Sequence, residues 1–148
     1  MVQATLDDGQ TLTALNEVYV GHASHQTSRY RLSLADRSER QASSGLIVAT
    51  GTGSTGWCRS AWLERQSHLA LPTPQEPSLS FFVREAWPSP ATGTSLTEGV
   101  LEAGTTLCVS VESDRLVVFG DGLEADCLSA SWGQTVAVER SSRLLHLV

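Results

Sequence analysis

Short apolar runs separated by turn signals constrain the fold of this chain more than any other feature. Runs rich in Val, Leu, Tyr and Thr occupy residues 2–6, 11–15, 17–22, 28–34, 45–50, 79–86, 106–112, 116–119, 135–139 and 144–148. Several alternate apolar and polar side chains, as strands with one buried face do. Asp8-Gly9 suits a hairpin turn between the first two runs, and Ser141-Ser142 suits one between the last two. We therefore expect a mainly β fold.

One segment has the character of a helix. Residues 55–66 follow a Gly-Ser-Thr string that can cap a helix, and they carry Trp57, Ala61, Trp62 and a late arginine. After this segment, three prolines interrupt residues 71–78, which we interpret as a surface connection. Residues 93–98 have the composition of a second loop.

Composition narrows the classes of function. With 148 residues, 41% hydrophobic and 18% charged, the chain has the size and polarity of one globular domain. We expect a single domain spanning 1–148, with neither a membrane span nor a secretory leader. We expect a cytoplasmic location. A net charge of -6 without a cluster of basic residues argues against nucleic-acid binding. The three cysteines lack metal-ligand spacing, so we expect no metal site.

The most distinctive string is the glycine-rich segment of residues 51–56, which follows the apolar run 46–49. Its glycines let a ligand approach the backbone, and the hydroxyls of Thr52, Ser54 and Thr55 supply hydrogen-bond donors. The string matches G-x-G-x-x-G, but a dinucleotide-binding βαβ unit also needs an acidic residue about 20 positions later, where this chain has Glu76 within the proline segment. We reject that fold and keep the segment as a candidate ligand contact. A strand-to-helix turn that binds nothing is the alternative.

Two weaker polar elements accompany this segment. Asn16 and Glu17 stand at the start of an apolar strand, and Asp121-Gly122 follows another one. Each has a plain interpretation, as a solvated strand end and as a turn.

Taken in order, these three elements resemble the NAD kinase family. The residues that carry the resemblance are 14–18, 45–55 and 121–122, and the strings Ser43-Ser44-Gly45-Leu46 and Gly56-Trp57 are similar to the mitochondrial-type branch and its bacterial relatives. The resemblance implies a C-terminal, two-sheet β-sandwich domain that binds NAD, part of an enzyme that phosphorylates the adenosine ribose 2′-hydroxyl to give NADP. The implied cofactor contacts are Asn16, Glu17, Thr52, Ser54, Thr55, Gly56, Trp57, Ser60 and Asp121.

The resemblance also implies what this chain lacks. The family places its catalytic aspartate in a Gly-Gly-Asp-Gly-Thr motif of an N-terminal domain, and no counterpart occurs here. We therefore expect no catalytic residue in this chain, ATP and Mg²⁺ binding only together with the missing domain, and no kinase activity of the chain alone. By analogy with the family we expect a homodimer or a higher oligomer. Apart from the resemblance, Arg84 and Glu85, adjacent on a predicted strand, are candidates for phosphate and hydroxyl contacts, with an exposed strand pair as the alternative.

Two other interpretations compete with this one. The first is the C-terminal domain of a lipid kinase of the diacylglycerol or sphingosine type, although an acidic chain without a basic patch suits anionic bilayers poorly. The second is a β-sandwich binding module without enzymatic function. Binding of NAD that depends on Asn16 and Glu17 would distinguish the kinase half from both.

Overall fold

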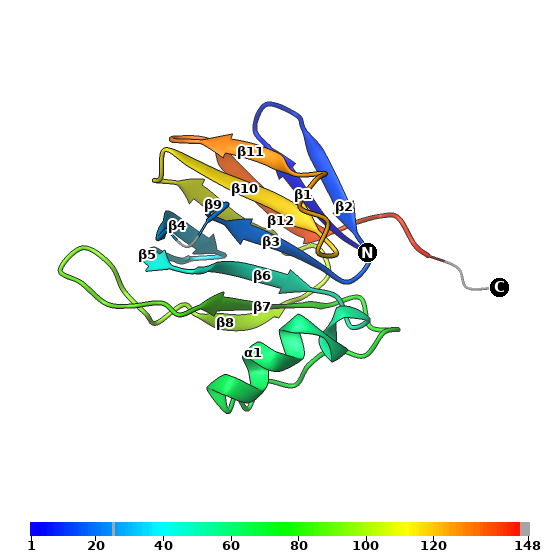
Figure 1. Ribbon diagram of the computed structural model, residues 1–148. Coiled ribbons are helices and arrows are strands. Elements are labelled where there is room, and N and C mark those ends of the chain that lie inside the picture. Colours follow the sequence, from blue (N-terminus) through cyan, green and yellow to red (C-terminus); the bar gives the residue numbers. More distant parts are fainter. Residues whose placement is uncertain (25, 146–148) are drawn as a thin grey trace.

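The computed structural model of the chain describes residues 1–24 and 26–145. Within these residues, the strands form two antiparallel sheets of six strands each, packed as a β-sandwich (Figure 1). Sheet A has the order β2-β1-β12-β9-β4-β5 and consists of β1 (Val2–Leu6), β2 (Thr11–Ala14), β4 (Ser28–Leu34), β5 (Arg37–Ser43), β9 (Leu107–Val111) and β12 (Thr135–Arg140). Sheet B has the order β11-β10-β3-β6-β7-β8 and consists of β3 (Glu17–Gly21), β6 (Gly45–Ala49), β7 (Leu79–Arg84), β8 (Glu98–Leu101), β10 (Arg115–Gly120) and β11 (Leu128–Ser131). The predicted mainly β fold is confirmed.

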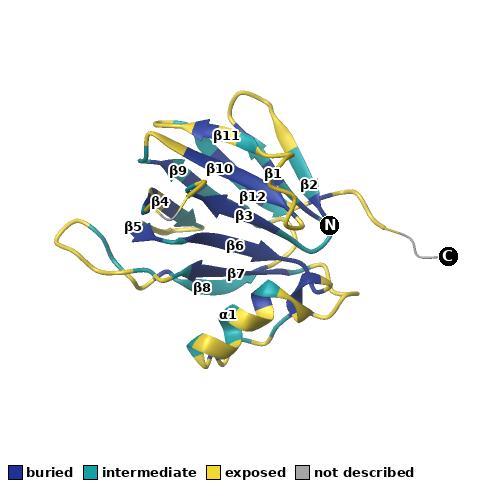
Figure 2. Ribbon diagram, viewed as in Figure 1, coloured by how far each residue is buried: buried dark blue, intermediate teal, exposed yellow. Residues whose placement is uncertain are grey.

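The main hydrophobic core lies between the two sheets (Figure 2). In sheet A, strands β1, β4 and β9 alternate buried and more exposed side chains, because only the face toward sheet B is covered. Tyr30, Leu32 and Val109 are fully buried members of this core. The other face of sheet A bears small and polar side chains.

Sheet B is buried more completely. Every residue of β6 is buried, and so are the first five residues of β7. Helix α1 (Trp57–Arg65) packs against the outer face of these two strands, where Cys58 joins Ala49 and Phe82 in a second apolar cluster with Trp62 beside them. Figure 1 shows the helix alongside β6, β7 and β8. Sheet B therefore lies between the core and the helix.

Some predicted boundaries were wrong. Strands β5, β8 and β11 were not predicted, and β8 begins at Glu98, inside the segment assigned to a loop. The helix begins at Trp57 rather than at residue 55, because Gly53–Thr55 forms a separate 3-10 turn and Gly56 has a non-helical backbone (φ -104°, ψ -124°). The expected capping side chain is absent from the start of α1. Residues 144 and 145 form no strand, and the rest of the predicted final strand, residues 146–148, lies outside the described residues.

Candidate functional site

The start of β3 and the glycine-rich segment are in direct contact. The Thr50 N–H donates to the carbonyl oxygen of Asn16 at 2.8 Å, and the Thr50 hydroxyl donates to that of Leu15 at 2.8 Å. Gly53 lies so close to Asn16 that an added Cβ would be 2.2 Å from the Asn16 carbonyl oxygen. Only glycine allows this approach of two backbones. The start of β3 and the glycine-rich segment, which the resemblance assigns to one cofactor site, therefore lie against each other at Asn16 and Gly53. The cofactor contacts of Asn16 and Glu17 stay predictions.

The hydroxyls of this segment serve the shape of the loop. The Ser54 hydroxyl is buried and donates to the Thr50 carbonyl oxygen at 3.1 Å, and the Thr50 hydroxyl accepts from the Gly53 N–H at 3.2 Å. Thr55 is exposed, and its hydroxyl donates to the carbonyl oxygen of Thr52 at 3.4 Å. The cofactor contacts predicted for Ser54 and Thr55 stay predictions, and within the chain both side chains stabilise the turn.

Asp121 holds the start of β3 from the other side. It follows β10, adopts a left-handed backbone conformation (φ 54°), and directs its carboxylate at the residues that begin β3. The carboxylate accepts the N–H groups of Leu15 at 2.8 Å, Asn16 at 2.7 Å and Glu17 at 3.3 Å. Asp121 therefore positions Asn16 and Glu17, a role the sequence did not predict for it.

Glu17 is the polar group that links this backbone arrangement to the outer face of sheet B. Its side chain shares that face with Tyr19, two residues along β3. Partial burial raises the pKa of the Glu17 carboxyl, and the nearby Asp121 carboxylate raises it further. A carboxylate with few water neighbours is a strong acceptor for a ligand hydroxyl or N–H.

An aromatic floor, formed by Tyr19, Trp57 and Phe119, covers the outer face of sheet B next to Glu17. The Tyr19 ring lies flat across Gly21 and Gly45, since an added Cβ on either glycine would come within 2.1 Å and 2.6 Å of the tyrosine, respectively. Trp57 stacks beside it at 5.4 Å with an interplanar angle of 18°, and Phe119 lies 4.9 Å away at 34°. The Tyr19 hydroxyl donates to the carbonyl oxygen of Ser44 at 2.9 Å, which fixes the ring. This floor is preorganised to stack a planar ligand.

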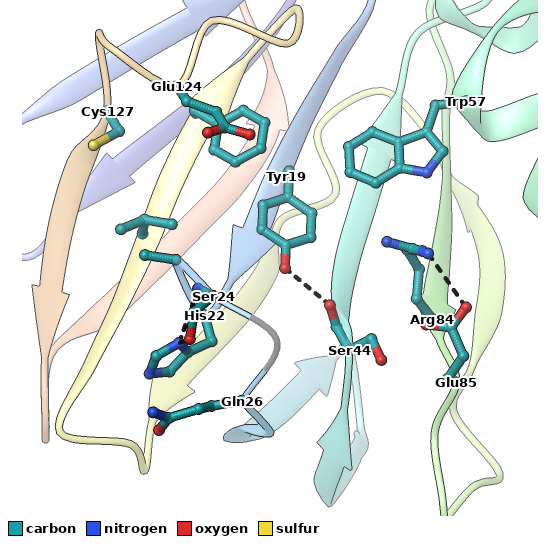
Figure 3. A pocket seen from close by; sticks show the side chains of 13 residues that line it. Tyr19, His22, Ser24, Gln26, Ser44, Trp57, Arg84, Glu85, Glu124 and Cys127 are labelled. Atoms are coloured by element: carbon teal, nitrogen blue, oxygen red, sulfur yellow. Dashed lines mark hydrogen bonds and ion pairs between the residues drawn. The ribbon is translucent and has the colours of Figure 1, made fainter.

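An open pocket of about 670 Å³ stands on the aromatic floor (Figure 3). Its polar rim includes His22, Arg84, Glu85 and Glu124. Arg84 holds its guanidinium 5.1 Å from the centre of the Trp57 ring and forms an ion pair with Glu85 at 3.3 Å. Volumes of roughly 300–1,000 Å³ are usual for small-molecule sites. The pocket thus combines a stacking surface, one cation and several hydrogen-bonding groups.

Of the nine residues predicted as cofactor contacts, eight do not line this pocket, Asn16 and Glu17 among them. Trp57 does, whereas Thr52 lines a separate hollow of about 520 Å³ between Leu15 and residues 74–79. Gly56 and Ser60 are exposed at the start of α1. The nine residues are therefore divided among the start of β3, the glycine-rich segment, the start of α1 and the turn after β10, with Trp57 in one cavity and Thr52 in another.

Sequence reasoning missed Tyr19 and Phe119. A tyrosine two residues before a glycine on one strand, Tyr19 and Gly21, is the one local signal for a ring lying flat on a sheet. Phe119 comes from β10, which pairs with β3 across about a hundred residues of sequence. Nothing local in the sequence joins the two aromatic residues.

The buried thiol of Cys58 is not suited to nucleophilic chemistry. It lies 3.3 Å from the Ser80 hydroxyl, and burial raises its pKa. Among residues 1–24 and 26–145, no group of three or more His, Cys, Asp or Glu side chains could hold a metal ion. In the same part of the chain, no helix has the length and apolar character needed to cross a membrane.

No protein-family model and no curated protein matches this chain.

Proposed function

We propose that this chain is the NAD-binding half of an NAD kinase. One observation carries the proposal: the backbone of Asn16 and the glycine-rich segment touch, Asp121 holds the adjacent Glu17, and a pocket floored by Tyr19 and Trp57 opens beside them. These groups come from distant parts of the sequence. A plain structural turn needs none of the aromatic floor, so the combination supports a ligand site.

The proposed roles follow from the chemistry of a dinucleotide. The flat rings of Tyr19 and Trp57 stack a base, which supplies much of the binding energy. The Glu17 carboxylate accepts hydrogen bonds from ribose hydroxyls. Arg84, at the rim, pairs with a phosphate oxygen after exchanging its ion pair with Glu85.

In this proposal the chain positions NAD and a second domain performs the transfer. Phosphoryl transfer depends on holding the accepting hydroxyl in line and on neutralising phosphate charge with Mg²⁺. Following the resemblance, we assign Mg²⁺ and ATP to the other domain. We expect the chain alone to bind NAD without phosphorylating it, and to associate at least as a dimer, which sedimentation velocity with NAD would test.

Calorimetry and amide NMR spectra with NAD test the proposal together. We expect saturable heat, with the strongest shifts at the Trp57 indole N–H and at the amides of residues 53–57. Trp57→Ala should weaken binding roughly 5- to 150-fold, since one stacked base contributes about 1–3 kcal/mol. Glu17→Gln should weaken it as well. Trp132→Ala is the matched control, because Trp132 is exposed and does not line the pocket.

A titration without saturable shifts up to millimolar NAD would contradict the proposal. Equal loss of affinity in Trp57→Ala and Trp132→Ala would also contradict it, since the site would then lie elsewhere. Circular dichroism of each variant separates loss of the ligand contact from loss of the fold.

A further inference from the structure

Three arginines gather on the outer face of sheet A, whereas the aromatic floor belongs to sheet B. Arg31 on β4 and Arg40 on β5 are directly opposite in the strand register, and Arg29 lies two residues before Arg31 on the same face. Like charges directly opposite on a sheet repel each other. The chain as a whole has a net charge of -6, so this local excess of positive charge is not a consequence of composition.

One carboxylate forms ion pairs with two of these arginines. Glu112 receives Arg40 Nε at 2.7 Å and stands 3.9 Å from Arg31 Nε. Arg29 forms no ion pair within 4 Å among the described residues. Glu112 therefore pairs with two of the three guanidinium groups, and the third has no such partner among the described residues.

Two of the arginines, Arg29 and Arg40, border a hollow of about 230 Å³. Its floor includes Ala42, and one wall is the exposed indole of Trp87. The segment that carries Trp87 is pinned along the edge of β5, since the Trp87 N–H donates to the Ala42 carbonyl oxygen at 3.1 Å and the Gly93 N–H donates to that of Arg40 at 2.9 Å. Arg29 and Arg40 line the hollow together with Glu112, so the unbalanced charge has a shaped cavity beside it.

We propose that this hollow binds the phosphate group of a small molecule. Guanidinium groups match the geometry of phosphate oxygens with paired N–H donors, and a recess strengthens each charge pair relative to bulk water. The size of the hollow suits a phosphate with a small flat group attached, which Trp87 would contact. The site is independent of the NAD proposal, because it lies on the other sheet and shares no lining residue with the larger pocket.

Glu112 provides a specific test of the proposed phosphate site. The Glu112 carboxylate forms an ion pair with Arg40, so a phosphate must compete with this carboxylate for the guanidinium group. Removal of its charge by Glu112→Gln should therefore strengthen phosphate binding several-fold. A purely structural ion pair predicts loss of stability without a gain in affinity for anions.

The test is a ¹H–¹⁵N NMR titration with inorganic phosphate and, separately, with phenyl phosphate, at ionic strength held constant with chloride. We expect saturable shifts at the Arg29 and Arg40 Nε–H and the Trp87 indole N–H. Arg29→Gln and Arg40→Gln should each weaken binding about 10-fold, the loss of roughly one charge-assisted hydrogen bond. Arg140→Gln is the control, an exposed arginine outside the hollow.

The two probes distinguish the source of the phosphate. Tighter binding of phenyl phosphate, with the difference lost in Trp87→Ala, assigns the site to a phosphate ester with a ring. Equal binding of both probes assigns it to free phosphate. Shifts that do not saturate by about 50 mM, or that persist in the Arg29→Gln/Arg40→Gln double variant, would overturn the proposal, as would a Glu112→Gln variant that binds phosphate no more tightly.

Discussion

The outer faces of the two sheets differ in the side chains and elements that cover them. On sheet B, aromatic side chains and helix α1 cover the strands, and glycines leave room for a flat ring. On sheet A, the outer face consists of small and polar side chains such as Ser33, Cys108 and Ser110, with the arginines at one corner. The same sandwich therefore offers one surface suited to stacking and another suited to charge.

The burial pattern along each strand shows whether one or both faces of its sheet are covered. Strands β6 and β7 are apolar along their length because both faces are covered, whereas β1 and β9 alternate because one is open. Continuous apolar runs in the sequence thus mark the sheet that carries the proposed NAD site. Substitutions on each sheet measure how far stability and ligand binding depend on these two kinds of surface.

The largest effect is expected for Gly45→Ala on sheet B. Gly45 has φ 113°, and an added Cβ would be 2.6 Å from the Tyr19 ring, so the change adds backbone strain and displaces the aromatic floor. We expect a loss of about 3–4 kcal/mol in the free energy of unfolding, measured with urea. Gly9→Ala in the β1–β2 turn is the control, because its φ of 91° is strained alike but nothing lies within 4 Å. Its expected cost is about 1–2 kcal/mol, and equal losses would show that the tyrosine plays no part.

Asp121→Asn should have the second largest effect. The neutral amide keeps one acceptor oxygen and the left-handed backbone, but it loses the charge that binds three N–H groups of residues 15–17. We expect a loss of about 1–2 kcal/mol in urea denaturation. Asp126→Asn is an exposed control on the same loop. An unchanged stability together with weaker NAD binding would assign Asp121 to the ligand instead of the β3 turn.

The fold was predictable to the extent that strands are apolar. β5 escaped because Arg37–Ser43 reads as a polar segment, yet it pairs with β4 along its whole length and places a buried Gln41 inside the sandwich. β11 was missed because a short strand at a sheet edge needs few apolar residues. The final predicted strand failed at residues 144 and 145, where apolar side chains are exposed. Composition identifies core strands better than edge strands.

The candidate site was predictable only where the residues in contact belong to the motifs that carry the resemblance. The contact of Asn16 with the segment 51–56 followed from the resemblance, and it is present. The alignment of Tyr19 with Phe119 depends on the pairing of β3 with β10, which no local pattern specifies. Hydroxyls such as that of Ser54 suggested ligand contacts, but the loop itself uses them.

Two tyrosines allow a comparison of the core between the sheets with the outer face of sheet B. Tyr30 is fully buried in the core and shares a 2.7 Å hydrogen bond with the Ser43 hydroxyl, whereas Tyr19 on the outer face donates to Ser44. Tyr30→Phe leaves a buried hydroxyl short of a partner and should cost about 1–2 kcal/mol, and Tyr19→Phe about 0.5–1 kcal/mol, by urea denaturation. A larger loss for Tyr19→Phe would mean that its hydroxyl, rather than the glycines, holds the ring flat.

The smallest expected effects concern two carboxyl groups whose pKa values move in opposite directions. Burial raises the pKa of Glu39 on β5, but hydrogen bonds from Ser95, Gln41 and Leu96 outweigh it and lower the pKa to about 2. Its contribution to stability is therefore complete above its ordinary value of 4.5 and is lost as pH falls toward 2. Glu17 on sheet B has a raised pKa, so the folded state binds its proton more readily and gains stability as pH falls toward 4.5.

Urea denaturation at a series of pH values separates these two contributions. Glu39→Gln should flatten the loss of stability between pH 4.5 and 2, and Glu17→Gln should remove a gain that appears above pH 4.5. Both changes are modest, because water screens these partly exposed groups. The two slopes of stability against pH have opposite signs. One denaturation series therefore distinguishes Glu39 on sheet A, whose carboxylate is satisfied by hydrogen bonds, from Glu17, whose carboxylate is partly buried beside the proposed NAD site. A Glu17 contribution close to zero would show that its carboxyl is solvated as on a surface strand, and one of the same sign as that of Glu39 would show that the fold stabilises its charged form. Either result would remove the argument for a partly dry carboxylate beside the proposed NAD site.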